Sequence, residues 1–441
     1  MALDDAAAID PIEVGKEAAK HFHFQGGYRN LNHGSFGTYP GAVRTTLRAL
    51  QDECEGQPDR FIRYTYPRKV DESRKAVAEY LNAPADAVVF VPNATTGVNT
   101  VLRNLVWQPG DVIVFLSTIY GACQKTIEYL TETTPVELQA VEVTYPTSDV
   151  DLIQAFSRAI SSVEAAGKTP KLAMFDTIVS MPGVRVPFEQ LTQLCRQYGI
   201  LSLIDGAHSI GQIPINLVEL DPDFYISNLH KWLHVPRGCA VFYCPARNQP
   251  LMRSSLPTSH GFIPKTNTGL VSPLPPSQKS EFVNQFEFTG TIDTSPYLCV
   301  DTALKWRRRV VWRGLTGEEA IMSYYTFLAR EAGQIVAGIL GTGVMENSGG
   351  TLQGCAFSNV VLPLSLQHDA AGEHATAVAI AQWISNVLVE EYNTFLAILV
   401  HGGKWWVRLS AQVYLDEEDF RWAGQMLEEV CTRASNGEWR G

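Results

Sequence analysis

Short apolar runs alternate with longer amphipathic stretches between about Asp71 and Tyr243. Runs of this length, bounded by turn residues, are typical of buried strands, and the stretches between several of them have the spacing of amphipathic helices. The apolar runs are AVVFV (87–91), DVIVFL (111–116), LAMFD (172–176), ILSLID (200–205) and GCAVFY (238–243). Helical stretches follow at 93–105, 120–130 and 187–199. This alternation predicts an α/β fold with a mostly parallel sheet flanked by helices.

The pattern changes in the last third of the chain. Residues 264–280 are rich in Pro, Ser, Thr and Gly, which predicts a long loop, either a lid or a connector. Helical periodicity dominates from about Leu298, and the runs 355–364 and 404–415 have the composition of strands. The expected organisation is an N-terminal arm (1–30), a large domain (31–297) and a smaller α+β domain (298–441). The arm is expected to pack with the small domain or to cross to a partner subunit.

Composition narrows the classes of function. The 441 residues are 45% hydrophobic and 18% charged, which indicates a globular protein of more than one domain. A net charge of −11 argues against nucleic acid as a partner, because no basic excess is present to neutralise phosphates. The eight cysteines show no metal-ligand spacing, so no metal site is expected, and no apolar run reaches the roughly 18 residues of a membrane span. A cytoplasmic location is expected.

Three features occur in an order that suits one kind of chemistry. Asn93 to Gly97 open a predicted helix with small and hydroxylic residues, and a helix N-terminus favours an anion. Asp205 ends a predicted strand, where ligands bind in open α/β sheets. Lys231 lies in the apolar stretch YISNLHKWLHVPRGCAVFY (225–243). Taken singly, these residues are more often a helix cap, a turn aspartate and a lysine that reaches the surface.

Together they match the needs of pyridoxal 5'-phosphate (PLP). The phosphate of PLP requires an anion site, and its ring nitrogen requires a carboxylate that keeps the ring protonated. Its aldehyde requires a lysine whose pKa is lowered from about 10.4, so that the amine is a nucleophile. The buried setting of Lys231 would lower that pKa by desolvation.

The segment DGAHSIGQIPINLVELDPDFYISNLHKWLHVPRGCAVFY (205–243) resembles the PLP-binding segment of the class V aminotransferase family. The resemblance extends over most of the chain, from NLNHGSFGTYP (30–40) to RLSAQVY (408–414). It implies a fold type I PLP-dependent enzyme with a mostly parallel seven-stranded sheet. It also implies a homodimer with the active site at the subunit interface and an amino acid as the substrate.

The resemblance assigns roles position by position. Lys231 matches the Schiff-base lysine, Asp205 the partner of the pyridine nitrogen, and His208 the contact to the phenolic oxygen. Tyr120 matches the residue over the cofactor ring and a catalytic acid. The remaining cofactor positions are Ala94, Thr95, Thr96, Ser180, Ser227 and His230, together with Gly290 and Thr291, which would reach the neighbouring subunit's phosphate. Arg408 matches the clamp for the substrate carboxylate, and Asn32 and His33 are placed at the mouth of the site. His230 as a core histidine, Tyr120 as a stacking residue only and Arg408 as a surface ion-pair partner remain open.

Within the family, the chain resembles the fungal hercynylcysteine sulfoxide lyases of ergothioneine biosynthesis. The shared stretches include TIYGACQKTIEY (118–129), SNLHKWLHVPRGCAVFY (227–243) and SLPTSHGFIP (255–264). This implies C–S bond cleavage by β-elimination, with Trp232, Phe36 and Tyr39 as candidate aromatic walls for a cationic side chain. A desulfurase that carries a persulfide is not expected, because 341–354 contains no cysteine and Cys355 leads into a strand.

Three alternatives stay open at this point. The lyases carry glutamine at the position of His208, and histidine there is familiar from epimerase-like relatives. A PLP-dependent cyclase of the loline pathway, which decarboxylates an aminoalkylated amino acid into a bicyclic amine, is of similar sequence type. A non-catalytic scaffold would have lost the lysine or the aspartate, whereas this chain has both Lys231 and Asp205.

Overall fold

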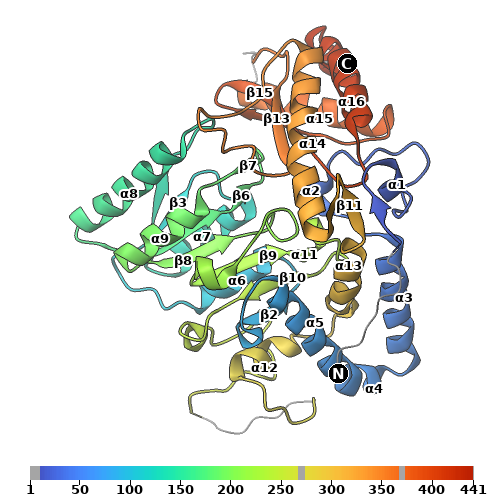
Figure 1. Ribbon diagram of the computed structural model, residues 1–441. Coiled ribbons are helices and arrows are strands. Elements are labelled where there is room, and N and C mark those ends of the chain that lie inside the picture. Colours follow the sequence, from blue (N-terminus) through green and yellow to red (C-terminus); the bar gives the residue numbers. More distant parts are fainter. Residues whose placement is uncertain (1–9, 267–273, 367–372, 441) are drawn as a thin grey trace.

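The computed structural model describes residues 10–266, 274–366 and 373–440. Its largest sheet has seven strands in the order β2-β10-β9-β8-β5-β3-β4 (Figure 1). The strands are β2 (Val88–Val91), β3 (Asp111–Leu116), β4 (Glu137–Val141), β5 (Thr169–Asp176), β8 (Leu201–Asp205), β9 (Phe224–Asn228) and β10 (Ala240–Tyr243). Only β10 runs antiparallel to its neighbours in this sheet, so the predicted mostly parallel seven-stranded α/β fold is confirmed.

Helices connect the parallel strands, and their lengths follow from the apolar periodicity. The helices of the large sheet's layers are α5 (Tyr66–Tyr80), α6 (Ala94–Asn104), α7 (Gly121–Thr133), α8 (Asp149–Ala165) and α9 (Phe188–Tyr198). The strands β2, β3, β5, β8 and β10 and the helices α6, α7 and α9 lie where the sequence predicts them. The sequence pattern missed β4, because this edge strand is half exposed and carries polar residues in place of an apolar run.

The sheet topology brings particular strand ends together. β5 and β8 are adjacent and parallel, and their last residues, Asp176 and Asp205, are directly paired in register. β9 lies on the other side of β8 and runs without a loop into the short helix α11 (Leu229–Trp232), which carries Lys231. The carboxyl ends of parallel strands meet at one edge of a sheet, so this topology gathers both carboxylates and the lysine at one place.

The C-terminal part forms a second group of elements, which lies at one end of the molecule in Figure 1. It contains α14 (Gly317–Leu340), α15 (Glu373–Glu390), α16 (Glu417–Ser435) and an antiparallel sheet in the order β13-β15-β14. Its strands are β13 (Phe357–Val361), β14 (Ala397–His401) and β15 (Lys404–Ser410), of which the sequence predicted the first and the last. Residues 267–273, in the predicted loop 264–280, lie outside the described residues. None of the described helices is long and apolar enough to cross a membrane.

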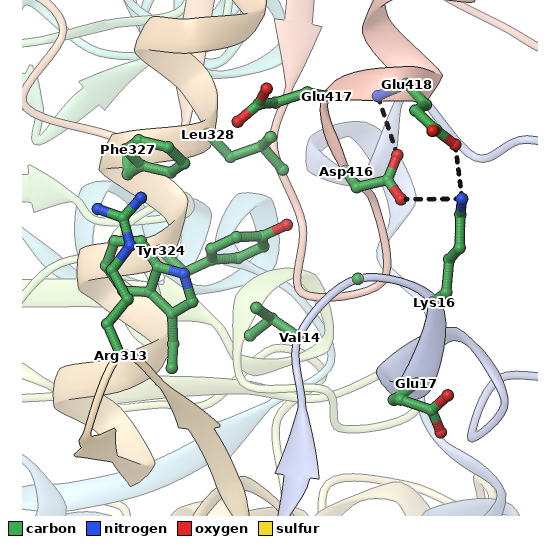
Figure 2. A pocket seen from close by; sticks show the side chains of 12 residues that line it. Val14, Lys16, Glu17, Arg313, Tyr324, Phe327, Leu328, Asp416, Glu417 and Glu418 are labelled. Carbon is green, nitrogen blue, oxygen red and sulfur yellow. Dashed lines mark hydrogen bonds and ion pairs between the residues drawn. The ribbon is translucent and has the colours of Figure 1, made fainter.

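The N-terminal segment packs on the C-terminal elements of its own chain. Strand β1 (Ile12–Glu13) pairs in parallel with β11 (Val310–Trp312), and β12 (Leu315–Thr316) completes this small sheet. Lys16 donates a 2.5 Å hydrogen bond to Glu418 at the start of α16. Figure 2 shows the open cavity of about 490 Å³ that this packing leaves between the segment, α14 and α16. None of the residues that line it belongs to the candidate site.

Arg307 in α13 (Val300–Arg307) connects the two groups of elements from a fully buried position. Its guanidinium donates two hydrogen bonds of 2.6 Å to the carboxylate of Glu318 in α14. It also donates to the carbonyl oxygens of Trp232 (2.6 Å) and Gly211 (2.9 Å). The carbonyl of Trp232 belongs to the residue after Lys231, so this cation fixes the backbone that carries the lysine.

Replacing Arg307 by alanine is expected to destabilise the protein by about 3 kcal/mol or more, because it leaves Glu318 and two buried carbonyl groups without their donor. Urea unfolding followed by circular dichroism measures this change. Arg308→Ala, in the next and exposed position, is the matched control and should change stability by less than about 0.5 kcal/mol. Equal effects of the two substitutions would contradict the proposed connection.

Candidate active site

Lys231 lies at the carboxyl edge of the sheet, close against a second segment of the chain. Its Nζ atom is 3.1 Å from Nε2 of His208, and although the residue as a whole is half-buried, burial is the main influence on its amine. The backbone of Gly37 packs directly on α11, where a Cβ atom would lie 1.8 Å from the carbonyl oxygen of His230. With a φ of +63°, Gly37 also holds a conformation that favours glycine. The segment 30–40 therefore closes over the lysine because of this glycine.

Two carboxylates face Lys231 from the adjacent strand ends. Asp205 is buried and accepts hydrogen bonds from the backbone N–H of Ala207 (2.9 Å) and from the thiol of Cys123 (3.5 Å). Burial raises the pKa of Asp205. Burial and the charge of Asp205 raise the pKa of Asp176 well above its usual range, and Oδ2 of Asp176 has no hydrogen-bond partner among the described residues. The pKa of Asp176 is raised further than that of Asp205, so Asp205 is the better candidate for a carboxylate that pairs with a protonated ring nitrogen.

Burial lowers the pKa of Lys231 from 10.5 to about 8. Asp205 opposes this shift, and the nearby charge of Arg408 adds to it. The amine therefore becomes neutral, and hence nucleophilic, within the range of an ordinary working pH.

The N-terminus of α6 presents unpaired donors. Asn93 caps the helix by accepting a 2.8 Å hydrogen bond from the N–H of Thr96, and the N–H of Ala94 donates to Oδ1 of Asn228 (2.9 Å). The N–H and hydroxyl groups of Thr95 have no partner among the described residues. Gly97 allows α6 to pack closely on β9, since a Cβ there would lie 2.7 Å from Ile226. These donors at a helix N-terminus form a suitable anion site.

The expectation that Ser227 contacts the phosphate is not supported by the structure. Ser227 is fully buried, and its hydroxyl donates to the carbonyl of Gly206 on the opposite side of β9 from α6. Successive side chains of a strand point to opposite faces, so Asn228 faces α6 instead. Nδ2 of Asn228 has no partner among the residues described, which makes it the better candidate for the phosphate.

His230 has one ring nitrogen engaged and one without a partner in the described parts of the chain. Nδ1 lies 3.0 Å from the carbonyl of Cys239, so this nitrogen carries the proton. Burial lowers the pKa of His230 to about 4, and the neutral ring presents a lone pair at Nε2. A phosphate contact by His230 therefore requires protonation of the ring, and this assignment stays a prediction.

Arg408 is buried on β15 and is not a surface ion-pair partner. Its guanidinium donates to the carbonyl of Ser180 (2.6 Å), to Oδ1 of Asn32 (2.8 Å) and to the hydroxyl of Ser35 (3.0 Å). It also lies over the ring of Phe357, 4.5 Å from the centroid. The Nε–H group is buried without a partner among the described residues, and burial lowers the pKa of Arg408 to about 10. An uncompensated buried cation with a free donor suits a carboxylate ligand.

Two further expectations need correction. His33 does not lie at the mouth of the site: it is 1% exposed, and its ring nitrogens are bonded to the hydroxyl of Tyr414 and the carbonyl of Lys231. Trp232 is fully buried against Phe357 and cannot form a wall that a substrate touches. Both residues instead support the segment that carries Lys231. Phe36 is 70% exposed, and Tyr39 is half-buried.

The remaining candidates lie at the surface of this chain. Tyr120 precedes α7 and is 48% exposed. Gly290 and Thr291 lie in a partly exposed segment, where Gly290 has a φ of +110°. No hydrogen bond within the described ranges joins any of these three residues to Lys231 or Asp205. Their contacts to a cofactor stay predictions.

The sequence analysis overlooked three residues of this cluster. Asp176 follows the apolar run LAMF just as Asp205 follows LSLI, so the same signal could have identified it. Asn228 could have been chosen over Ser227 by the alternation of strand residues. The contact between Cys123 and Asp205 joins a helix to a strand 82 positions away and has no local sequence signal.

Comparison with known proteins agrees with this geometry. The family model of the class-V aminotransferases matches residues 62–269. The L-cysteine desulfhydrase-like protein lolT1 of Epichloe uncinata is 39% identical, over 97% of this chain and 98% of the relative. The hercynylcysteine sulfoxide lyase of Schizosaccharomyces pombe is 30% identical, over 95% and 98%. The chain belongs to the class-V aminotransferase family.

A solved structure shows the same fold. The cystine C–S lyase C-DES, in complex with its product cysteine persulfide, has a TM-score of 0.70 and covers 91% of this chain and 97% of its own, at 19% identity. A variant of C-DES has also been solved with glycine linked to its PLP cofactor. The chain therefore has fold type I, and its membership of the class-V aminotransferase family makes it a PLP-dependent enzyme. The unpaired donors at α6, the buried Asp205 and the amine of Lys231 with its lowered pKa fit this cofactor.

When bound, PLP supplies an electron sink for bonds at the substrate Cα atom. The protein supplies the proton transfers and the positions. Lys231 holds or releases a proton at Nζ, Asp205 keeps a negative charge in a buried place, and Arg408 offers a buried cation for a carboxylate. The packing of Gly37 on α11 keeps bulk water from one side of the lysine.

The pH dependence of Lys231 is a direct test of this electrostatic setting. In the apo protein the neutral fraction of Lys231 should rise as the pH rises through about 8, and the exposed Lys75 serves as the reference lysine. The rate of carbamoylation by cyanate, followed for each lysine by peptide mass spectrometry, measures this. A midpoint for Lys231 equal to that of Lys75 would contradict the assigned environment.

Proposed function

We propose that this PLP-dependent lyase cleaves the C–S bond of a cysteine S-conjugate by β-elimination. One observation carries the proposal. Lys231, whose pKa is lowered to about 8, lies in the same buried site as Arg408, whose hydrogen-bond partners include no carboxylate. The arginine would bind the substrate α-carboxylate, and the amine of Lys231 would take the Cα proton. The Cβ–S bond would then break with its electron pair on sulfur, and the leaving group would be protonated, with Tyr120 as the candidate acid.

The cysteines support elimination over persulfide transfer. All eight are free thiols, and seven of them are buried. Cys355, the cysteine nearest to the start of β13, is fully buried, and burial raises its pKa to about 12. A persulfide carrier needs an accessible thiolate, which none of these seven residues provides. Cys54 is only half-buried, at the end of α3 (Gly41–Gly56), but burial and the charges of Glu55 and Asp293 raise its pKa, which disfavours the thiolate.

The substrate is proposed to be a sulfoxide similar to hercynylcysteine sulfoxide, because of the likeness to the Schizosaccharomyces pombe lyase. Its trimethylammonium group would bind to aromatic faces. Trp232 is unavailable for this, so the exposed rings of Phe36 and Tyr120 are the better candidates. His208 offers a hydrogen-bonding side chain next to Lys231.

A decarboxylating cyclisation of an aminoalkylated amino acid is the second candidate. This candidate rests on the resemblance to the loline-pathway enzymes, and the chain is 39% identical to the L-cysteine desulfhydrase-like protein lolT1. Both reactions use the same lysine, aspartate and arginine, and they differ in which bond at Cα is broken. Epimerisation of an amino acid is a third outcome of the same chemistry.

The active site is proposed to be completed in a homodimer. Thr291 and the neighbouring Ile292 are exposed on this chain, and Ile292 and Phe36 expose 48% and 70% of their surface. A second subunit that docked over these side chains would remove their apolar surface from water. In the proposed dimer, Gly290 and Thr291 would reach the phosphate in the other subunit.

Product analysis separates the candidate reactions. The purified holoprotein is expected to release pyruvate and ammonia from a cysteine S-conjugate sulfoxide, measured with a coupled lactate dehydrogenase assay. Lys231→Ala should lose this activity, and Lys75→Ala, at an exposed lysine, should retain it.

Release of carbon dioxide from an aminoalkylated amino acid without pyruvate from the sulfoxide would favour the cyclase. Racemised substrate without either product would favour the epimerase. Full activity in Lys231→Ala would contradict every version of the proposal.

A further inference from the structure

Among the described residues, the side chain of Trp232 makes one hydrogen bond, and this bond is directed toward the site. Its indole N–H donates to Nδ1 of His208 over 3.3 Å. On the other side of the same imidazole, Nε2 lies 3.1 Å from Nζ of Lys231. Three side chains thus form a line from the buried core to the amine, although Trp232 touches neither substrate nor cofactor.

We propose that Trp232 is a positioning residue: it fixes His208 as the Nε2–H tautomer, so that the imidazole donates a hydrogen bond to Lys231 and holds its Nζ as a neutral amine. An indole N–H is only a donor, so Nδ1 of His208 must be the acceptor and carries no proton. A neutral imidazole then has its proton on Nε2. An ammonium group has no lone pair, so only the neutral form of Lys231 can accept this hydrogen bond.

Aromatic side chains surround the indole of Trp232 and confine it. Trp232 is fully buried, with ring centroids 5.2 Å from His33, 5.5 Å from Tyr325 and 5.4 Å from Phe357. Phe357 also meets the edge of His208 at 5.2 Å. A Cβ atom on Gly34 would lie 2.4 Å from Phe357 and 3.2 Å from Trp232, so the segment 33–36 confines the indole as well.

The other groups around the pair do not replace this contact. Asp205, Asp176, Cys123 and Arg408 act on the charge of Lys231 from β8, β5, α7 and β15. Lys231, Arg408 and His230 act on the charge of His208, and all three, after burial itself, favour its neutral ring. Within the described residues, Trp232 is the one group that donates to Nδ1, so the choice of tautomer rests on it.

Nitrogen NMR of the apo protein tests the tautomer without turnover. In protein labelled with ¹⁵N-histidine, His208 is identified by the signal that is lost in His208→Gln. Above pH 8, where the amine of Lys231 is mostly neutral, the expected spectrum has a protonated Nε2 and an unprotonated Nδ1. Trp232→Phe keeps an aromatic ring but removes the donor, and it should give a mixture of tautomers or the Nδ1–H form.

The same substitution should change the reactivity of Lys231. With Nε2 as an acceptor, the imidazole favours the ammonium form, so the pKa of Lys231 should rise by about half a unit and carbamoylation by cyanate near pH 7.5 should slow about threefold. Trp405→Phe is the matched control, because Trp405 is also buried and its indole N–H has no partner among the described residues. It should leave both readouts unchanged.

Two results would overturn the proposal. One is a protonated Nδ1 of His208 in the unsubstituted protein, which decides the question even if Trp232→Phe does not fold. The other is a folded Trp232→Phe protein whose tautomer and Lys231 midpoint equal those of the unsubstituted protein. Neither result depends on which reaction the holoenzyme catalyses.

Discussion

The removal of one lysine amine from water is the constraint on which the rest of the site depends. Burial lowers the pKa of Lys231 to about 8, and the surrounding groups are arranged so that this shift is useful. His208 offers a contact to the neutral amine, and Asp205 supplies a nearby negative charge. An amine that loses its proton near pH 8 can bind an aldehyde and can also move a proton, which are the two tasks of a PLP lysine.

The fold delivers these groups from distant parts of the sequence. Parallel pairing of β5, β8 and β9 brings Asp176, Asp205 and the start of α11 to one edge. Arg307 donates a hydrogen bond to the carbonyl of Trp232, the residue after the lysine. Gly37 lets the segment 33–37 pack closely on α11, which carries the lysine. Arg408 arrives from the C-terminal sheet (Figure 1), so the site lies where the two groups of elements meet. A change in their relative position would therefore alter the distance between the arginine and the lysine.

Much of this could be predicted from the sequence, and the failures have physical reasons. Strands with continuous apolar runs and helices with clear periodicity were found, whereas the half-exposed edge strand β4 and the hairpin strand β14 were missed. Lys231, Asp205, His208 and Arg408 were identified because each stands at a motif position, and the structure brings them together.

Errors arose where side-chain direction decides the role: Ser227 faces away from α6, and His33 and Trp232 are internal supports. The hydrogen bonds between Cys123 and Asp205 and between Trp232 and His208 depend on tertiary packing alone, so no local sequence pattern predicts them.

The measurement that tests the central claim most directly is to locate the cofactor on the chain. The holoprotein is treated with borohydride, which makes the bond between PLP and its lysine permanent, and the digested protein is analysed by mass spectrometry. The account predicts a pyridoxyl group on the peptide that contains Lys231 and on no other lysine peptide. A pyridoxyl group on a different lysine, or none on protein saturated with PLP, would contradict it.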